Sequence, residues 1–298
     1  MRSIIQRTLC LGSVLLVLPL VAAAQTEIER RVPASADGTV AISNIAGSVV
    51  VTGWDRDEVE VTGTLGRNVE ELEVESDARG VEIEVKLPRR NRGGGGSAHL
   101  EIRVPRRSRV EVETVSAEIT ADELEGALDL ESVSGSITVA GQPAAVRAET
   151  VSGLIEVEAD TARISAATVS GSITLTGTRG EVEAEAVSGN ITVKSARDLE
   201  RADLEVVSGQ IAFTGSLAPD VDFSASCHSG TIELTLPEAT SARVVAESFS
   251  GRIDNEFGPE ARRVDRYAPG KELSFTLGSG QGRIELETFS GAITLRRR

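Results

Sequence analysis

Short runs in which apolar and polar residues alternate fill most of the chain, and each run has the length of a β-strand. In GALDLESVSGSITV, which begins at Gly126, the apolar positions follow two alternations that are out of phase. The first contains Leu128 and Leu130, and the second contains Val133, Gly135, Ile137 and Val139. Since successive side chains of a strand point to opposite faces, the slip predicts a bend or bulge near Glu131 and Ser132 that turns both sets toward one interior.

The phrase Ser-Gly-x-Ile recurs at a nearly constant period as far as the C-terminus. Its copies supply Ser134, Gly135, Ser152, Gly153, Ser170, Gly171, Ser188, Gly189, Ser208, Gly209, Ser229, Gly230, Ser250, Gly251, Ser290 and Gly291. The first four copies are 18 residues apart, the next intervals are 20, 21 and 21, and the last is 40. A degenerate copy starts at Ser116, a further 18 residues upstream.

A fixed period near 20 residues is typical of a solenoid, and the β-branched residues and glycine of every cycle are unfavourable in helices. The sequence therefore predicts an all-β fold: a parallel β-solenoid or β-helix-like array of about nine rungs, roughly 40 Å long at about 4.8 Å per rung. The glycine has the interior parity and the serine the outward one. We interpret both as structural, because a catalytic residue is not needed eight times.

The chain divides into three parts on this interpretation. Residues 1–24 resemble a secretory signal peptide, with Arg2 and Arg7 before an apolar run and expected cleavage before Gln25. Residues 25–110 form an N-terminal β-rich cap, and residues 111–298 form the repeats with an irregular insertion at 254–281. Within the cap, the glycines at 93–96 predict the tip of a hairpin with strands at 81–87 and 98–104.

Export predicts a periplasmic, cell-surface or extracellular location, with no transmembrane span in the mature chain. The net charge of −15 becomes −17 when Arg2 and Arg7 are removed, and an acidic chain is a poor partner for nucleic acid. Cys10 would leave with the signal peptide, so Cys227 would have no intrachain disulfide partner.

Three stretches carry a resemblance to a known family: SNIAGSVVVTGWDRDEVEV, IRVPRRSRVEVETVSAEIT and the VSGSI series. Over roughly residues 29–295 the chain resembles the putative-adhesin family of bacterial envelope proteins. The resemblance implies an exported or surface-facing β-solenoid-like domain, and it supplies no catalytic residues.

Basic residues gather around the predicted hairpin of an otherwise acidic chain. The candidate patch for an anionic ligand, such as lipid head groups, lipopolysaccharide or acidic glycans, contains Arg89, Arg90, Arg92, Arg106 and Arg107. A solvated hairpin that balances local acids is the alternative.

Acidic residues precede most Ser-Gly copies and predict a column on a stacked array, with gaps at Ala167 and Ser226. They are Glu113, Glu131, Glu149, Glu185, Glu205, Glu247 and Glu287. Such a column could bind calcium through its oxygens, or it could be a solvated edge that opposes aggregation. His228 occupies the position of Val133 and is expected to face inward, with Cys227 on the opposite parity.

Nothing in these patterns assigns a catalytic, cofactor-binding or metal-ligating residue, and we expect no cofactor. The favoured function is a non-enzymatic structural or adhesin-like module that binds an envelope component, a glycan or a protein. The alternative is a polysaccharide-active β-helix enzyme, a hydrolase or lyase, since paired carboxylates are abundant. A carbohydrate cleft usually also has aromatic platforms, and aromatic residues make up 3% of this chain.

Overall fold

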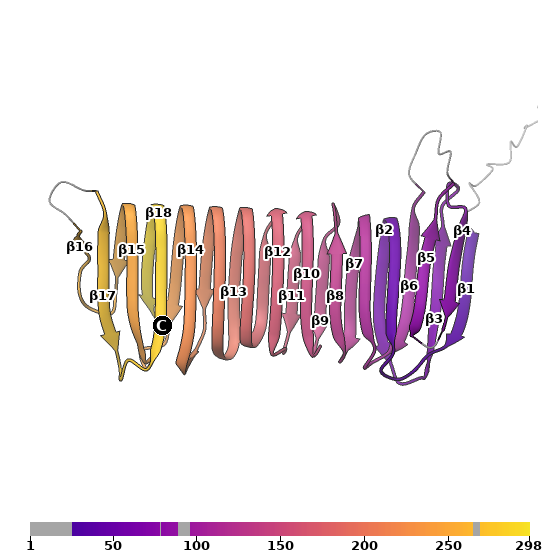
Figure 1. The fold of residues 1–298 in the computed structure, drawn as a ribbon, viewed down its shortest axis with the longest axis horizontal. Coiled ribbons are helices and arrows are strands. Elements are labelled where there is room, and N and C mark those ends of the chain that lie inside the picture. The colour runs from indigo at the N-terminus through magenta and orange to yellow at the C-terminus, as the bar shows by residue number, and fades with distance from the viewer. Residues whose placement is uncertain (1–25, 78, 89–95, 265–268) are drawn as a thin grey trace, which may run out of the picture.

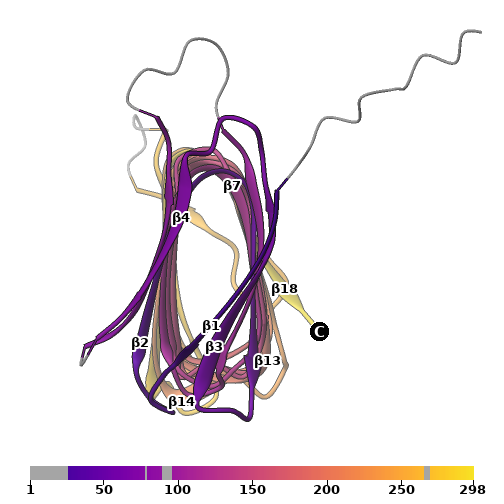
Figure 2. The ribbon, with the colours of Figure 1, turned by 90° about the vertical axis from the view of Figure 1, so that its right-hand side faces the viewer.

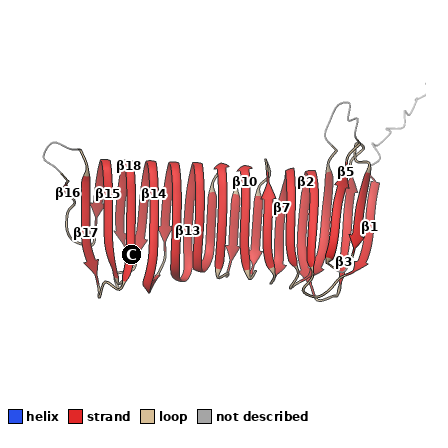
Figure 3. Cartoon of the chain, in the orientation of Figure 1, coloured by secondary structure: helices blue, strands red, loops and turns tan. Residues whose placement is uncertain are grey.

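The computed structural model describes residues 26–77, 79–88, 96–264 and 269–298. Within these ranges the protein is all-β and contains no helix, as Figure 3 shows. Accordingly, they hold no helix long and apolar enough to cross a membrane. The predicted signal peptide and the first three glycines of the predicted hairpin tip, 93–95, lie outside the described residues.

In the described part of the chain, eighteen strands form one large mixed sheet in which parallel pairs predominate. The strands are β1 (Thr26–Pro33), β2 (Thr39–Trp54), β3 (Glu58–Leu65), β4 (Glu71–Ser76), β5 (Gly80–Lys86), β6 (Ala98–Pro105), β7 (Arg109–Leu124), β8 (Ala127–Ser132), β9 (Ile137–Gly141), β10 (Ala145–Ser152), β11 (Ile155–Ala159), β12 (Arg163–Ser170), β13 (Ile173–Thr214), β14 (Leu217–Leu236), β15 (Ala242–Asn255), β16 (Arg262–Arg263), β17 (Lys271–Leu277) and β18 (Gly282–Arg297).

Each repeat supplies two arms that lie on opposite faces of a flattened ring, which Figure 2 shows end on. In the repeat of β8 and β9, the first arm pairs in parallel with β7 and β10. The second arm pairs in parallel with β7 and β11, so that Ile137 stands opposite Ile155. The repeats stack side by side along the long axis (Figure 1), and the register of their strands places equivalent residues opposite one another.

The interior of the ring is filled by aliphatic side chains from both arms. Leu128, Leu130, Ile137 and Val139 are each 3% exposed or less. The corner between the arms, however, differs from the prediction: Ser132 is buried and Val133 is 47% exposed. The alternation of buried and exposed residues shifts here because two successive residues, Val133 and Ser134, both point outward. The bend is thus one residue later than expected.

A hydrogen bond explains why the serine, and not the valine, lies inside. The backbone N–H of Gly135 donates to the Ser132 hydroxyl oxygen at 2.8 Å, and Thr114 donates its hydroxyl to the same oxygen at 2.9 Å. A buried amide at a tight corner needs an acceptor, which a hydroxyl provides and a valine side chain does not.

The N-terminal end continues the same stacking across residue 110. Strand β2 pairs in parallel with β7 through both arms, with Val40 opposite Val110 and Val49 opposite Ile119. Strands β5 and β6 do not form the predicted hairpin: β5 pairs with the first part of β2, and β6 pairs with its second part. The two strands are successive arms of one repeat. A short alternating sequence is typical of such an arm and of a hairpin strand alike, so the pattern did not distinguish them.

Antiparallel strands complete both ends of the described structure. Strand β4 pairs with β5, β3 pairs with β6, and β1 pairs with β3. At the other end, β17 pairs with β15, and β16 pairs with β17.

The last strand does not follow the chain order. Strand β18 lies between β14 and β15 and pairs in parallel with both, as Figure 1 shows at the yellow strand. Ser290 therefore stands between Ser229 and Ser250, although it follows both in the sequence.

Candidate functional site

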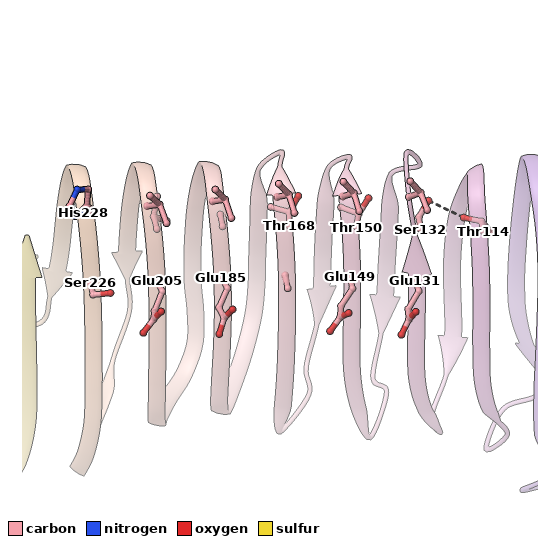
Figure 4. Close-up of a pocket in the computed structure, with 18 of the residues that line it drawn as sticks. Thr114, Glu131, Ser132, Glu149, Thr150, Thr168, Glu185, Glu205, Ser226 and His228 are labelled. Carbon is pink, nitrogen blue, oxygen red and sulfur yellow. Dashed lines mark hydrogen bonds between the residues drawn. The ribbon is translucent and has the colours of Figure 1, made fainter.

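A groove of about 690 Å³ runs across the first arms of successive repeats, from β7 to β14 (Figure 4). One wall is a row of glutamates, Glu113, Glu131, Glu149, Glu185 and Glu205, with Ser226 at its end. The other wall is formed by Val133, Val151, Val169, Val187, Val207 and His228. The floor between them contains Thr114, Ser132, Thr150, Thr168, Ala186 and Val206.

The glutamate row follows from the register of the stacked strands. Glu131 stands opposite Glu149, and Glu185 is separated from Glu149 by Ala167. Glu205 faces Ser226, which in turn faces Glu287 on β18. The predicted gaps at 167 and 226 therefore fall within one continuous row, in which neighbouring side chains start about 4.8 Å apart.

Among the described residues, ion pairs compensate the charge of this row only at its second and third glutamates. Arg147 forms ion pairs with Glu131 at 3.1 Å and with Glu149 at 2.6 Å. No ion pair to Glu185 or Glu205 occurs among the described residues. Burial, together with the charges of Glu205 and Glu183, raises the pKa of Glu185 above its ordinary value.

The opposite wall is an apolar ridge that points into solvent. Its five valines are between 46% and 50% exposed. Beyond the groove the ridge continues through Phe289 and Phe249, which are 50% and 57% exposed. The rings of His228 and Phe289 stack with centroids 4.9 Å apart, and those of Phe249 and Phe289 stack at 4.8 Å.

His228 belongs to this ridge, so the expectation of an inward-facing histidine is wrong. It is exposed and stacks on Phe289, while Cys227 takes the interior position with 2% exposure. The cause is the corner described above, which turns every residue of the Val133 position outward. Burial raises the pKa of the Cys227 thiol, which donates a hydrogen bond to the Gly209 carbonyl oxygen at 3.8 Å.

Hydroxyls of the groove floor bond to the corner backbone in some repeats, whereas the Thr168 hydroxyl has no partner among the described residues and Ala186 and Val206 have no hydroxyl to offer. Thr150 donates to the carbonyl oxygen of Gly135 at 3.2 Å, and the Thr114 hydroxyl shares its one proton between Ser132 and the carbonyl oxygen of Ala117, also at 3.2 Å. The repeated serines that follow the ridge, such as Ser134, are exposed. No group of three or more His, Cys, Asp or Glu side chains suited to a metal ion occurs in the described part of the chain.

The predicted basic patch is described only in part. Arg89, Arg90 and Arg92 lie outside the described residues. Arg106 forms ion pairs with Asp55 at 3.0 Å and Glu123 at 2.9 Å, and hydrogen bonds to both carboxylates raise its pKa. Arg107 is exposed beside it. Both arginines follow the end of β6 and are eight residues or more from its first residue, so they lie at the far end of that strand from its start.

Sequence reasoning identified the glutamate row but assigned the valines to the interior, and so it missed the groove. One available signal was the small hydroxyl residue that precedes most of these valines, as in Thr150-Val151. A hydroxyl that recurs in such a β-strand repeat is the residue expected at a buried corner with backbone groups to satisfy.

Comparison with solved structures returns proteins that are described as adhesins. A putative adhesin from Bacteroides fragilis is 11% identical with a TM-score of 0.47, covering 92% of this chain and 98% of that one. A putative adhesin from Parabacteroides distasonis is 12% identical with a TM-score of 0.35, covering 93% and 98% of the two chains. A putative cell adhesion protein from Clostridium sporogenes is 10% identical with a TM-score of 0.26, covering 92% and 100%.

No curated protein matches the chain. The profile of the toastrack DUF4097 family matches residues 38–227, a region that spans both the N-terminal strands and most of the repeats. This match covers more than half of the sequence and agrees with the resemblance seen in its motifs. The chain belongs to the toastrack DUF4097 family.

Proposed function

We propose that this protein is an exported β-solenoid of about nine rungs that acts as a non-enzymatic, structural or adhesin-like binding module. It binds an envelope component, a glycan or a protein through its long exposed faces in the periplasm or at the cell surface. The observation that carries the proposal is the apolar ridge, which presents one half-exposed valine per repeat along the groove.

A continuous exposed apolar ridge is unusual on a soluble protein and is typical of an interaction site. The position does not need an apolar residue for folding, because its side chain lies outside the core. Threonine would keep the branched Cβ that strands favour and would be better solvated. Retention of valine in five successive repeats therefore supports a surface that contacts a partner.

The arrangement of the acids gives little support to the polysaccharide-active enzyme. Glycoside hydrolysis needs two carboxyl groups placed on either side of the scissile bond. The groove glutamates stand in one row on one wall and face aliphatic side chains. Its described lining contains no Trp, Tyr or Phe on which a sugar ring could stack.

The experiment is an array of glycans and purified envelope polymers, together with intact bacterial cells, probed with labelled mature protein. The matched variant carries Val169→Thr, Val187→Thr and Val207→Thr, three exposed and nearly isosteric changes. We expect specific binding by the wild type and at least a tenfold loss in the variant, with unchanged circular dichroism. Absence of any bound component would contradict a binding module, and release of new reducing ends from a bound polymer would contradict a non-enzymatic one.

A further inference from the structure

We propose that the groove binds a cationic amphipathic helix, which lies along the long axis of the protein with its basic side chains on the glutamate row and its apolar side chains on the valine ridge. This inference rests on the proposed binding function and names its surface and the chemistry of its partner.

The negative charge of the groove indicates that its partner carries positive charge. Glu185 and Glu205 lie next to Glu183 and Asp203, and none of the four forms an ion pair with a described residue. Burial and these neighbouring charges raise the pKa of Glu185, so its ionisation is less favourable than that of an ordinary glutamate. A lysine or arginine side chain placed here would relieve that repulsion, whereas an anionic polymer would increase it.

The two walls together select the shape of the partner. The glutamate row and the valine ridge are parallel and are separated by one buried residue in each repeat, as Glu185, Ala186 and Val187 illustrate. A ligand must therefore present a basic stripe and an apolar stripe side by side. An amphipathic helix with both stripes has this form and is a recurring ligand of apolar grooves.

The dimensions agree with a helix that runs across the strands. From Glu113 on β7 to His228 on β14 the groove crosses six strand-to-strand steps of about 4.8 Å, which gives about 29 Å. A helix of about 20 residues has this length. Its pitch of about 5.4 Å is close to the strand spacing, so that each helical turn lies near one repeat.

A second copy of the same chain is a less suitable occupant. Two copies that met along this groove would bring their glutamate rows together, in a chain whose net charge is already −15. The partner of the ridge should therefore differ in charge from the protein itself.

The test uses fluorescence anisotropy with a fluorescein-labelled peptide of about 20 residues, in which leucines follow the i, i+3, i+4, i+7 spacing and lysines form the adjacent face. A peptide of the same composition in scrambled order and a peptide with glutamate in place of lysine are the ligand controls. The groove variant carries Glu185→Gln and Glu205→Gln. The matched control, Glu156→Gln with Glu158→Gln, removes two exposed charges from β11 on the opposite face.

We expect the wild type to bind the amphipathic lysine peptide, with affinity about tenfold weaker in the groove variant and changed less than about twofold in the control. The difference between the groove variant and the wild type should shrink at about 0.5 M salt, because screening weakens exposed charge pairs. The Val169→Thr, Val187→Thr, Val207→Thr variant should lose affinity at both salt concentrations.

The inference is overturned if the scrambled peptide binds equally well, or if the control variant loses as much affinity as the groove variant. It is also overturned if sedimentation shows a dimer that the valine variant abolishes, since the ridge would then be a self-association surface. Binding on the array without binding of the lysine peptide would reject this inference and leave the proposed function standing. Loss of both would reject both.

Discussion

Replacing the repeated glycine at the centre of the stack should disrupt the packing between two repeats. At Gly209 the backbone has φ +151°, a conformation that residues with a side chain rarely adopt. An added Cβ would lie 1.8 Å from the carbonyl oxygen of Gly189 in the preceding repeat and 2.8 Å from its carbonyl carbon. Both atoms belong to backbone, so no side chain can rotate away.

The expected cost has two parts. Holding alanine at this φ costs about 1–3 kcal/mol, and forcing the two backbones apart costs about 1–3 kcal/mol more by analogy with overpacked cores. Gly209→Ala should therefore lower the free energy of unfolding by about 2–6 kcal/mol, a large share of the roughly 5–15 kcal/mol typical of a folded domain.

Two control variants separate these contributions. Gly258 has φ +148°, but a Cβ added there would meet no atom within 4 Å, so Gly258→Ala reports the backbone cost alone. Ser208 is exposed, and Ser208→Ala should change stability by less than about 0.5 kcal/mol.

The assay is urea unfolding followed by far-ultraviolet circular dichroism, with stability obtained from the midpoint and slope of the transition. Gly209→Ala should also split the transition, because each repeat mainly contacts its neighbours. If Gly209→Ala is no more destabilising than Gly258→Ala, the proposed crowding between successive glycines is refuted.

Three further predictions concern other parts of the molecule. Truncation before Gly282 should expose β14 and β15 to hydrogen exchange, because β18 pairs with both. The lost strand buries Ile284, Leu286, Ile293 and Leu295, worth up to about 6–12 kcal/mol of transfer free energy. Full protection of both strands after truncation would contradict this. Cys227 should react with a thiol reagent only in denaturant, because burial raises its pKa and leaves it 2% exposed, and rapid labelling of the native protein would refute its interior position. Burial and neighbouring carboxylates raise the pKa of Glu185 above 4.5, so the stability associated with its protonated form is present at lower pH and is lost as pH rises through the folded-state pKa. Glu185→Gln should therefore unfold at a higher urea concentration than the wild type near pH 7 but not near pH 4, and a lower midpoint near pH 7 would be the contrary result.

The corner of the repeat shows where sequence reasoning stops being sufficient. The alternation in GALDLESVSGSITV indicates two strands and a change of phase, but a one-residue shift can be absorbed on either side of Ser132. Hydrophobicity alone favours Val133 as the interior residue, whereas the buried amide of Gly135 needs the hydroxyl of Ser132. The same corner recurs where Ala186 and Val206 take the Ser132 position, because parallel stacking repeats its backbone along the array; it turns the valines outward, creates the ridge, and moves His228 and Cys227 to the sides opposite to those expected.

By itself the sequence determined the all-β class, the two-arm repeat and the acidic row, because these depend on alternation along one strand and on a fixed period. Only the tertiary structure decided which strands are neighbours: β5 and β6 on opposite arms of one repeat, and β18 between β14 and β15. Repeats with the same motif present equivalent edges, so any of them could pair with any other. The order of strands in the sheet depends on which strand edges remain free and on how the connecting segments reach them. A local sequence pattern has no information on either.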